Sequence, residues 1–242
     1  MRTTLDIATD IVCPPTDLWS DEPPVESDLH LQQIILLLSC LDWLWQDRND
    51  YYASGNLTIY YNERQLKQRD FFGPDFFLVL DTEKRPRKSW VVWGEGGKYP
   101  NVIIEILSDS TANVDRKAKK ELYQHTFRTP EYFWFDPNTL EWQGFTLIEG
   151  QYQPITPNEN GYLWSKQLGL YLGIFANKLR YFTESGELVP TPQESARQER
   201  LAKEQERLAK EQERLAKERE QQRAEKLAQK LRELGINPDE IA

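Results

Sequence analysis

Hydrophobic side chains change their spacing along the chain, following first a helix and then a series of strands. Between residues 26 and 46 they recur every three or four positions. The apolar residues at this helical spacing are Leu29, Ile34, Leu37, Leu38, Leu41 and Leu44. Such spacing gives a helix one apolar face, and either Pro24 or Ser27 is a suitable residue to begin it. We therefore predict an amphipathic helix that packs on the core.

From Tyr51 onward the pattern becomes one of short apolar runs between turn residues, which is typical of strands. A helical pattern returns between about Ser110 and His125, and a hairpin is expected around Gly150. Residues 81–100 are polar and rich in glycine and proline, so we expect a loop there. The predicted strands are residues 57–61, 75–80, 101–107, 132–135, 142–148 and 152–155. This order predicts an α/β fold, with a central mixed sheet of four or five strands flanked by the two helices and followed by the hairpin.

The C-terminal part of the chain is a charged repeat of strong helix formers. Leu201, Leu208 and Leu215 recur every seven residues within copies of RLAKEQE. The second core position of this heptad holds Gln205 and Gln212, which pack poorly. A long C-terminal charged helix is therefore expected, either as a solvated single helix or as a coiled coil. We divide the chain into an irregular leader (1–24), a folded domain (25–190) and a helical tail (191–242).

Charge and composition narrow the range of functions. The tail carries 12 acidic and 12 basic residues, so the net charge of −9 belongs to the first 190 residues. An acidic domain does not coat nucleic acid by charge alone, although a local basic patch can still hold DNA. The start of the chain lacks signal-peptide features, and Ile34 to Cys40 is too short an apolar run to span a bilayer. We therefore expect no membrane partner. The two cysteines have neither a metal-site spacing nor a disulfide pattern, which favours a cytoplasmic protein.

Two acidic residues at the predicted strands are the main chemical signal. Asp75 opens one strand after Gly73-Pro74, and Glu105 interrupts the otherwise apolar run of the next. A buried carboxylate costs several kcal/mol unless a partner compensates it, and a divalent cation shared by two carboxylates is one such partner. A turn residue at Asp75 and a salt-bridged acid at Glu105 are the simpler alternatives. Asp115, Lys119 and Tyr123 then follow on one face of the predicted second helix.

These residues form a pattern that resembles a known family. Pro74-Asp75 is followed by Glu105-Ile106-Leu107-Ser108, by the Asp115, Lys119 and Tyr123 series, and by a segment that runs from Glu131-Tyr132 to Asp136-Pro137. Over residues 25 to 190 the chain resembles the Uma-two-type restriction endonuclease family of the PD-(D/E)XK superfamily. The resemblance implies a restriction-endonuclease-like core that hydrolyses phosphodiester bonds in DNA. It also implies that Asp75 and Glu105 are catalytic residues that bind Mg²⁺ or Mn²⁺, and that the protein is a homodimer.

One position departs from the pattern of the superfamily. The superfamily motif Glu-x-Lys would put a lysine where this chain has Leu107. We expect Lys119, on the following helix, to supply the catalytic ammonium group, whereas Lys117 and Lys120 lie about 100° or more away around that helix. Without a lysine the domain would be an inactive module that binds metal or DNA. A scaffold whose tail binds a protein partner is a third possibility.

Several accessory residues follow from the same reasoning. Glu26 is a candidate extra carboxylate, or simply a favourable acid in the first helical turn. His30 is expected to be a packing or capping residue. Asp115 would orient Lys119 or form an ordinary helix ion pair, while Tyr123 belongs either to the core or to the site.

A basic segment separates the two predicted acidic strands. It consists of Lys84, Arg85, Arg87 and Lys88. We expect this loop to overhang the metal site and contact DNA phosphates, with a solvated turn as the alternative.

Overall fold

The computed structural model describes residues 14–62, 73–107 and 118–235. The chain divides into two compact units, residues 1–191 and residues 192–242, each of which is described separately.

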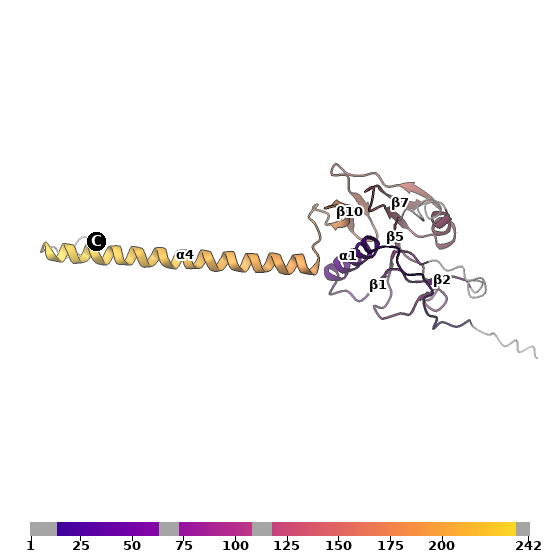
Figure 1. The fold of residues 1–242 in the computed structure, drawn as a ribbon, viewed down its shortest axis with the longest axis horizontal. Coiled ribbons are helices and arrows are strands. Elements are labelled where there is room, and N and C mark those ends of the chain that lie inside the picture. Colours follow the sequence, from indigo (N-terminus) through magenta and orange to yellow (C-terminus); the bar gives the residue numbers. More distant parts are fainter. Residues whose placement is uncertain (1–13, 63–72, 108–117, 236–242) are drawn as a thin grey trace, which may run out of the picture. The chain divides into compact units, whose positions relative to one another are not determined.

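The first unit is built on a mixed sheet with the strand order β1-β3-β5-β6-β7-β8 (Figure 1). The strands are β1 Tyr51–Ser54, β3 Phe76–Leu80, β5 Val102–Ile106, β6 Glu131–Phe135, β7 Trp142–Ile148 and β8 Gln151–Pro154. Neighbouring strands are antiparallel except β5 and β6, which are parallel. The expected α/β fold with a central mixed sheet is confirmed. Within the described residues the sheet has six strands rather than four or five, because the hairpin β7–β8 extends it instead of forming a separate addition.

The two faces of this sheet bury different clusters of side chains. On β3, Phe76 and Leu78 join the core cluster that includes α1, whereas Phe77 and Val79 join the cluster that includes Tyr123. Successive strand residues point to opposite faces, which explains this division. Odd-numbered positions of β3 therefore face the segment that carries Tyr123.

Helix α1 (Asp28–Leu44) covers the first of these faces. Its N-cap is Ser27, whose side chain accepts a hydrogen bond from the backbone N–H of His30, as expected for a capping residue. The buried residues run from His30 to Leu41. Leu29 and Leu44, which we expected in the core, are 45% and 40% exposed because they lie in the terminal turns outside this packed stretch.

Two smaller sheets complete the first unit. Strand β2 (Ile59–Tyr60) pairs in parallel with β4 (Trp90–Val91), so the expected loop over residues 81–100 contains a short strand. Strands β9 (Leu163–Ser165), β10 (Leu170–Phe175) and β11 (Lys178–Phe182) form an antiparallel sheet, whose residues join the same core cluster as α1.

The second predicted helix is only partly within the described residues. Asp115 lies outside them, as does the rest of the segment from Ser110 to Lys117. The described part includes a π-helix, η2 (Leu122–Phe127), that ends at Arg128 in the left-handed conformation. The helical pattern predicted up to about His125 is thus present in its described part, with π-helical turns over Leu122 to His125. Single π-turns of this kind are rare and occur frequently at functional sites.

The second unit contains helix α4 (Pro192–Glu233), a helix of 42 residues with no buried side chain. At about 1.5 Å per residue it is roughly 60 Å long. Acidic and basic side chains pair along it three or four residues apart, as in Lys203–Glu199 and Lys210–Glu206. Leu201 and Leu208 are about half exposed. In the part of the chain that the structure describes, no helix combines the length and apolar character needed to cross a membrane.

Candidate active site

The register between β3 and β5 brings the two predicted acids together. Phe76 lies opposite Ile104, so one further step places Asp75 opposite Glu105. Residues that face each other across antiparallel strands have Cβ atoms about 5 Å apart and point to the same face of the sheet. Both carboxyl groups are therefore directed toward the face on which Tyr123 lies.

The side chain of Glu105 is only 1% exposed, and besides Asp75 it contacts two side chains of the helical segment that follows β5. Tyr123 donates its hydroxyl proton to Oε1 at 2.6 Å, and Lys119 Nζ lies 3.0 Å from Oε2. Lys119 itself is 18% exposed. Both partners come from the segment around η2, so this segment holds Glu105 in one orientation.

Burial raises the pKa of Glu105 to about 8. The positive charge of Lys119 and the hydrogen bond from Tyr123 act in the opposite direction, while the nearby Asp75 carboxylate adds to the increase. Two carboxylates that share a poorly solvated site oppose each other's ionisation. At neutral pH this acid is therefore held mainly in its protonated form unless further positive charge enters.

Asp75 lies in a different environment within the same pair. One of its oxygens accepts a hydrogen bond from the backbone N–H of Ile106 at 2.7 Å. The other lies 2.9 Å from Nε2 of His30. Burial acts to raise the pKa of Asp75, but His30, Lys119 and the Ile106 N–H outweigh it and lower that pKa. The backbone N–H of His30 donates to the Ser27 cap of α1, so His30 is not itself the capping residue. Its ring contacts the acidic pair, a contact that the sequence pattern did not predict.

A cavity of about 140 Å³ opens beside Asp75. It is lined by residues from five separate segments, including Glu22, Glu26, His30, Ile106 and Lys119. Glu26, predicted as an accessory acid, therefore lies at the cavity, while its role stays a prediction.

Glu22 is a site residue that sequence reasoning missed. It is half-buried, and it accepts a hydrogen bond from Thr58 Oγ1 at 3.0 Å. Burial raises the pKa of Glu22, and the charge of Lys119 partly offsets this increase. A side chain at Gly73 would come within 2.5 Å of Glu22, so the glycine leaves room for this carboxylate beside the site.

Comparison with known proteins shows the family to which the chain belongs. The model of the Uma2 family, described as "Putative restriction endonuclease", matches residues 18–179, which is more than half of the chain. The chain belongs to the Uma2 family. No curated protein matches it. The solved structures that match include a putative nuclease of DUF820 from Anabaena variabilis, with 12% identity and a TM-score of 0.44 over 61% of this chain and 76% of the other.

Lys119 reaches the acidic pair from the helical segment that follows β5. Leu107, at the usual lysine position, is 2% exposed and belongs to the apolar interior. Lys119 contacts Glu105, whereas Lys120 points elsewhere, with its Nζ 3.5 Å from the centroid of the Phe145 ring. The structure therefore brings Asp75, Glu105, Lys119 and Tyr123 together.

The basic segment lies at the opposite end of β3 from Asp75. Strand β3 ends at Leu80, which pairs with Tyr51 of β1. Lys84 follows Leu80 shortly afterwards in the chain. Because strand residues are spaced by about 3.3 Å, the two ends of β3 lie more than about 10 Å apart. The expectation that this loop overhangs the acidic pair is wrong, because the chain runs along β3 away from Asp75 before it enters the loop. Contact between the loop and DNA stays a prediction.

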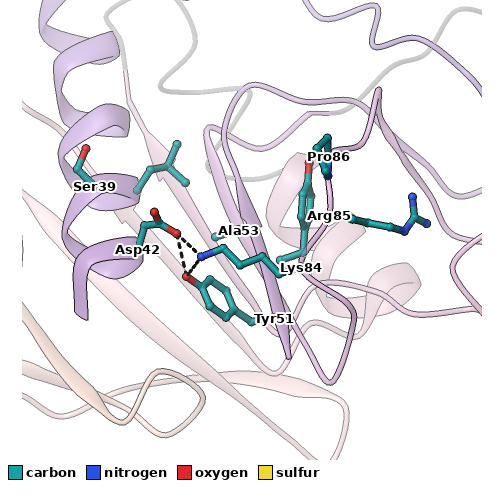
Figure 2. Close-up of a pocket in the computed structure, with 9 residues that line it drawn as sticks. Ser39, Asp42, Tyr51, Ala53, Lys84, Arg85 and Pro86 are labelled. Carbon is teal, nitrogen blue, oxygen red and sulfur yellow. Dashed lines mark hydrogen bonds and ion pairs between the residues drawn. The ribbon is translucent and has the colours of Figure 1, made fainter. Parts of the chain in front are cut away.

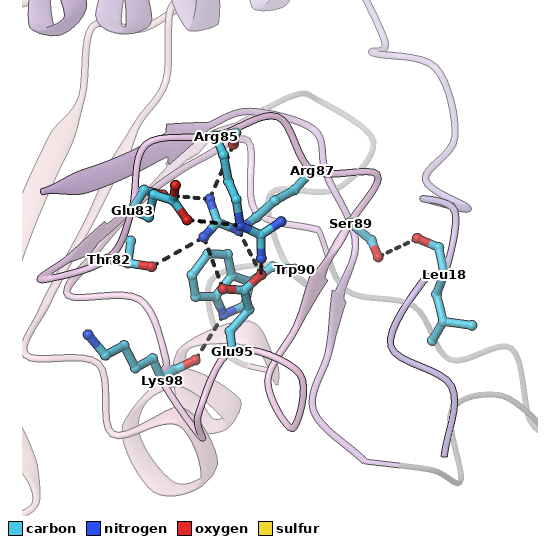
Figure 3. Close-up of polar contacts among 9 residues, drawn as sticks. All are labelled: Leu18, Thr82, Glu83, Arg85, Arg87, Ser89, Trp90, Glu95 and Lys98. Carbon is cyan, nitrogen blue, oxygen red and sulfur yellow. Dashed lines mark hydrogen bonds and ion pairs between the residues drawn. The ribbon is translucent and has the colours of Figure 1, made fainter. Parts of the chain in front are cut away.

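The cations of this segment have carboxylate partners close by. Arg87 contacts both oxygens of Glu95, at 2.7 and 2.9 Å, and Arg85 contacts the same carboxylate at 2.8 Å (Figure 3). Lys88 pairs with Asp17. The Arg87 guanidinium also lies over the rings of Tyr52 and Trp90. These pairs link the segment to its surroundings.

Proposed function

We propose that this chain is a divalent-metal-dependent endonuclease that hydrolyses phosphodiester bonds in DNA. The observation that carries the proposal is a buried Glu105 that faces Asp75 and lies 3.0 Å from the ammonium group of Lys119. Membership of a family described as restriction endonucleases supports the nuclease class.

The donor groups fit a small hard cation. Among the described residues no group of three or more His, Cys, Asp and Glu side chains is arranged to hold a metal ion. Mg²⁺ does not need three protein ligands of this kind, because it binds through one or two carboxylates and keeps several waters. Lys119 does not fully compensate the two carboxylates, because burial and the nearby Asp75 still raise the pKa of Glu105 to about 8. Asp75 and Glu105 would therefore hold Mg²⁺ or Mn²⁺, which when bound polarises a phosphate and lowers the pKa of water.

The remaining side chains have separate tasks in this proposal. Lys119 stabilises negative charge that develops on the phosphate, in place of the strand lysine that Leu107 replaces. Tyr123 fixes the orientation of Glu105 through its 2.6 Å hydrogen bond. His30 does the same for Asp75. Glu22 and Glu26, at the rim of the cavity, add negative charge that attracts cations.

The test is cleavage of supercoiled plasmid by the full chain in Mg²⁺ or Mn²⁺. Asp75→Ala and Lys119→Ala are compared with wild type, and Lys120→Ala is the control because its side chain contacts Phe145 instead of the acidic pair. We expect both site variants to lose cleavage by about 100-fold or more, the range for one electrostatic group. Lys120→Ala should cut as wild type does.

Each other outcome has a definite meaning. Cleavage that survives Lys119→Ala but not Asp75→Ala would keep the nuclease and remove Lys119 from its mechanism. A wild-type protein that binds Mn²⁺ and DNA without cutting either strand would replace the proposal with a catalytically inactive binding module. If it binds neither, the acidic pair is a structural feature, and the scaffold function of the tail becomes the leading hypothesis.

We further propose the domain division from which these roles follow. Residues 25–190 would form the nuclease domain, and the tail would provide a separate charged helix. A homodimer is expected by analogy with the superfamily alone, whose members generally act as dimers on duplex DNA. Light scattering of the full chain, with and without DNA, tests this expectation.

A further inference from the structure

A second cleft lies at the far end of β3 from the acidic pair (Figure 2). Its volume is about 480 Å³, which is within the range of about 300–1,000 Å³ for small-molecule sites. Three elements form its walls: the C-terminal half of α1, strand β1 and the basic loop. None of the acidic-pair residues lines it.

One end of this cleft presents a charged donor and a charged acceptor side by side. Lys84 Nζ donates to Oδ1 of Asp42 and, at 2.8 Å, to the hydroxyl of Tyr51. The Tyr51 hydroxyl donates in turn to Asp42 Oδ1 at 3.0 Å. The Asp42 side chain is 66% exposed, so its second oxygen can accept a hydrogen bond from a ligand. The Lys84 ammonium has a third N–H to offer.

The rest of the cleft is mainly apolar. Leu38, Ala53 and Pro86 line it together with the ring of Tyr52. That ring stacks on Trp90 with the centroids 5.5 Å apart and is therefore held in place. Ala53 has a small side chain, which leaves width for a flat group between the helix and the loop.

Arg85 supplies a cation away from the Asp42 end. In Figure 2 its side chain extends away from Asp42 and Lys84. Its side chain is 47% exposed. Its contact with Glu95 can be released, because Arg87 already binds both oxygens of that carboxylate. Arg85 is therefore available to an anionic group at the rim.

We propose that this cleft binds a nucleotide. The base lies against the apolar wall, and its edge, which carries donors and acceptors side by side, is read by Asp42 and Lys84. The phosphate binds to Arg85, and a guanidinium matches the geometry of its oxygens. A simple organic anion could contact Lys84 and Arg85 but offers no donor to the second, exposed oxygen of Asp42. The edge of a nucleobase carries both a donor for this oxygen and an acceptor for the third N–H of Lys84. The assignment stands independently of the nuclease proposal, because the two sites share no residue.

The experiment is calorimetric titration of the full chain with each of dAMP, dGMP, dCMP and TMP, beside the nucleosides and ribose 5-phosphate. At least one nucleotide should bind saturably and at least tenfold more tightly than ribose 5-phosphate, which has no base. Arg85→Ala should weaken the nucleotide tenfold or more and leave nucleoside binding unchanged. Lys98→Ala is the matched control, since this lysine contacts the Asp81 carbonyl and lies outside the cleft.

Two blocking variants keep the test decisive. Ser39→Trp fills the cleft from α1, and Pro86→Trp fills it from the exposed loop if the helix variant fails to fold. Either folded variant should abolish binding, whereas Asp75→Ala should retain it. Failure of all four nucleotides to saturate would overturn the proposal. Binding that survives the blocking variants, or that disappears in Asp75→Ala, would do so as well.

Discussion

The two ends of β3 carry charged clusters in opposite environments. At the Asp75 end, Glu105 is 1% exposed and burial raises its pKa to about 8. At the Lys84 end, Asp42 is 66% exposed, and its hydrogen bond with Lys84 lowers its pKa. An acid beside a lysine is therefore poorly compensated at the Asp75 end, whereas at the Lys84 end the lysine and the solvent stabilise the carboxylate. Burial, more than the number of charges, therefore distinguishes the two ends of β3.

The largest expected effect comes from removing the buried acid. Glu105→Ala should lower plasmid cleavage by about 1,000-fold or more, equivalent to roughly 4 kcal/mol of transition-state stabilisation. Glu121→Ala is the matched control, because Glu121 is 68% exposed and pairs only with His125 among the described residues. Equal losses in the two variants would show that burial does not distinguish these acids.

The next effect is on stability as a function of pH. The pKa of Glu105 is about 8 in the folded protein and 4.5 ordinarily. Between these values the folded state binds more protons than the unfolded chain, so its free energy of unfolding falls as pH rises from about 5 to 8. The lowered pKa of Asp75 acts in another window: its stabilising contribution is present above its ordinary value of 3.8 and is lost as pH falls below it.

Glu105→Gln should remove the decrease in the free energy of unfolding that wild type shows between pH 5 and pH 8. In EDTA at pH 8.5 the variant should be more stable than wild type by on the order of 3 kcal/mol, because a neutral amide replaces a buried charge. Urea unfolding at pH 5 and pH 8.5 measures the difference. If wild type and variant show the same dependence on pH, Glu105 does not titrate in this range.

A smaller effect distinguishes two arginines that both stack on aromatic rings. The Arg87 side chain is 3% exposed and binds Glu95, whereas Arg48 is 39% exposed and binds Asp50. Arg87→Ala leaves Glu95 partly buried with only Arg85, and should cost about 2–3 kcal/mol of unfolding free energy. Arg48→Ala should have little effect. Similar losses in chemical denaturation would mean that stacking rather than burial sets the contribution of Arg87.

The smallest effect is expected from the tail. Helix α4 has no buried side chain, so deletion of residues 192–242 should leave the unfolding temperature of the remaining chain unchanged within error. Scanning calorimetry of both proteins makes the comparison. A clear drop in the unfolding temperature would show that the tail stabilises the first unit.

The local pattern of the sequence was enough to predict the main strands and the first helix. The runs around Phe76 and Val102 are apolar on both faces, as buried strands require, and Ser27 begins α1 as capping chemistry predicts. The juxtaposition of Asp75 and Glu105 follows from an antiparallel pairing that strand periodicity alone does not specify.

Contacts between distant segments account for what the sequence did not predict. Strand β4 has only two residues and depends on pairing with β2, so no local period marks it. Glu22 approaches Asp75 only because the leader packs near Thr58 and Gly73. The basic loop lies close to Asp75 and Glu105 in the sequence, but it is far from them in the structure because it follows the far end of β3.

The central claim is that the buried pair of Asp75 and Glu105 holds a divalent cation, and thermal unfolding at pH 8.5 tests it most directly. Wild type, Asp75→Ala and Glu105→Gln would each be measured in Mn²⁺ and in EDTA. The account predicts that Mn²⁺ raises the unfolding temperature of wild type by several degrees, since a ligand that binds only the folded state stabilises it, and that both variants lose the increase. An unfolding temperature of wild type that is the same in Mn²⁺ and in EDTA, up to millimolar metal, would contradict the claim.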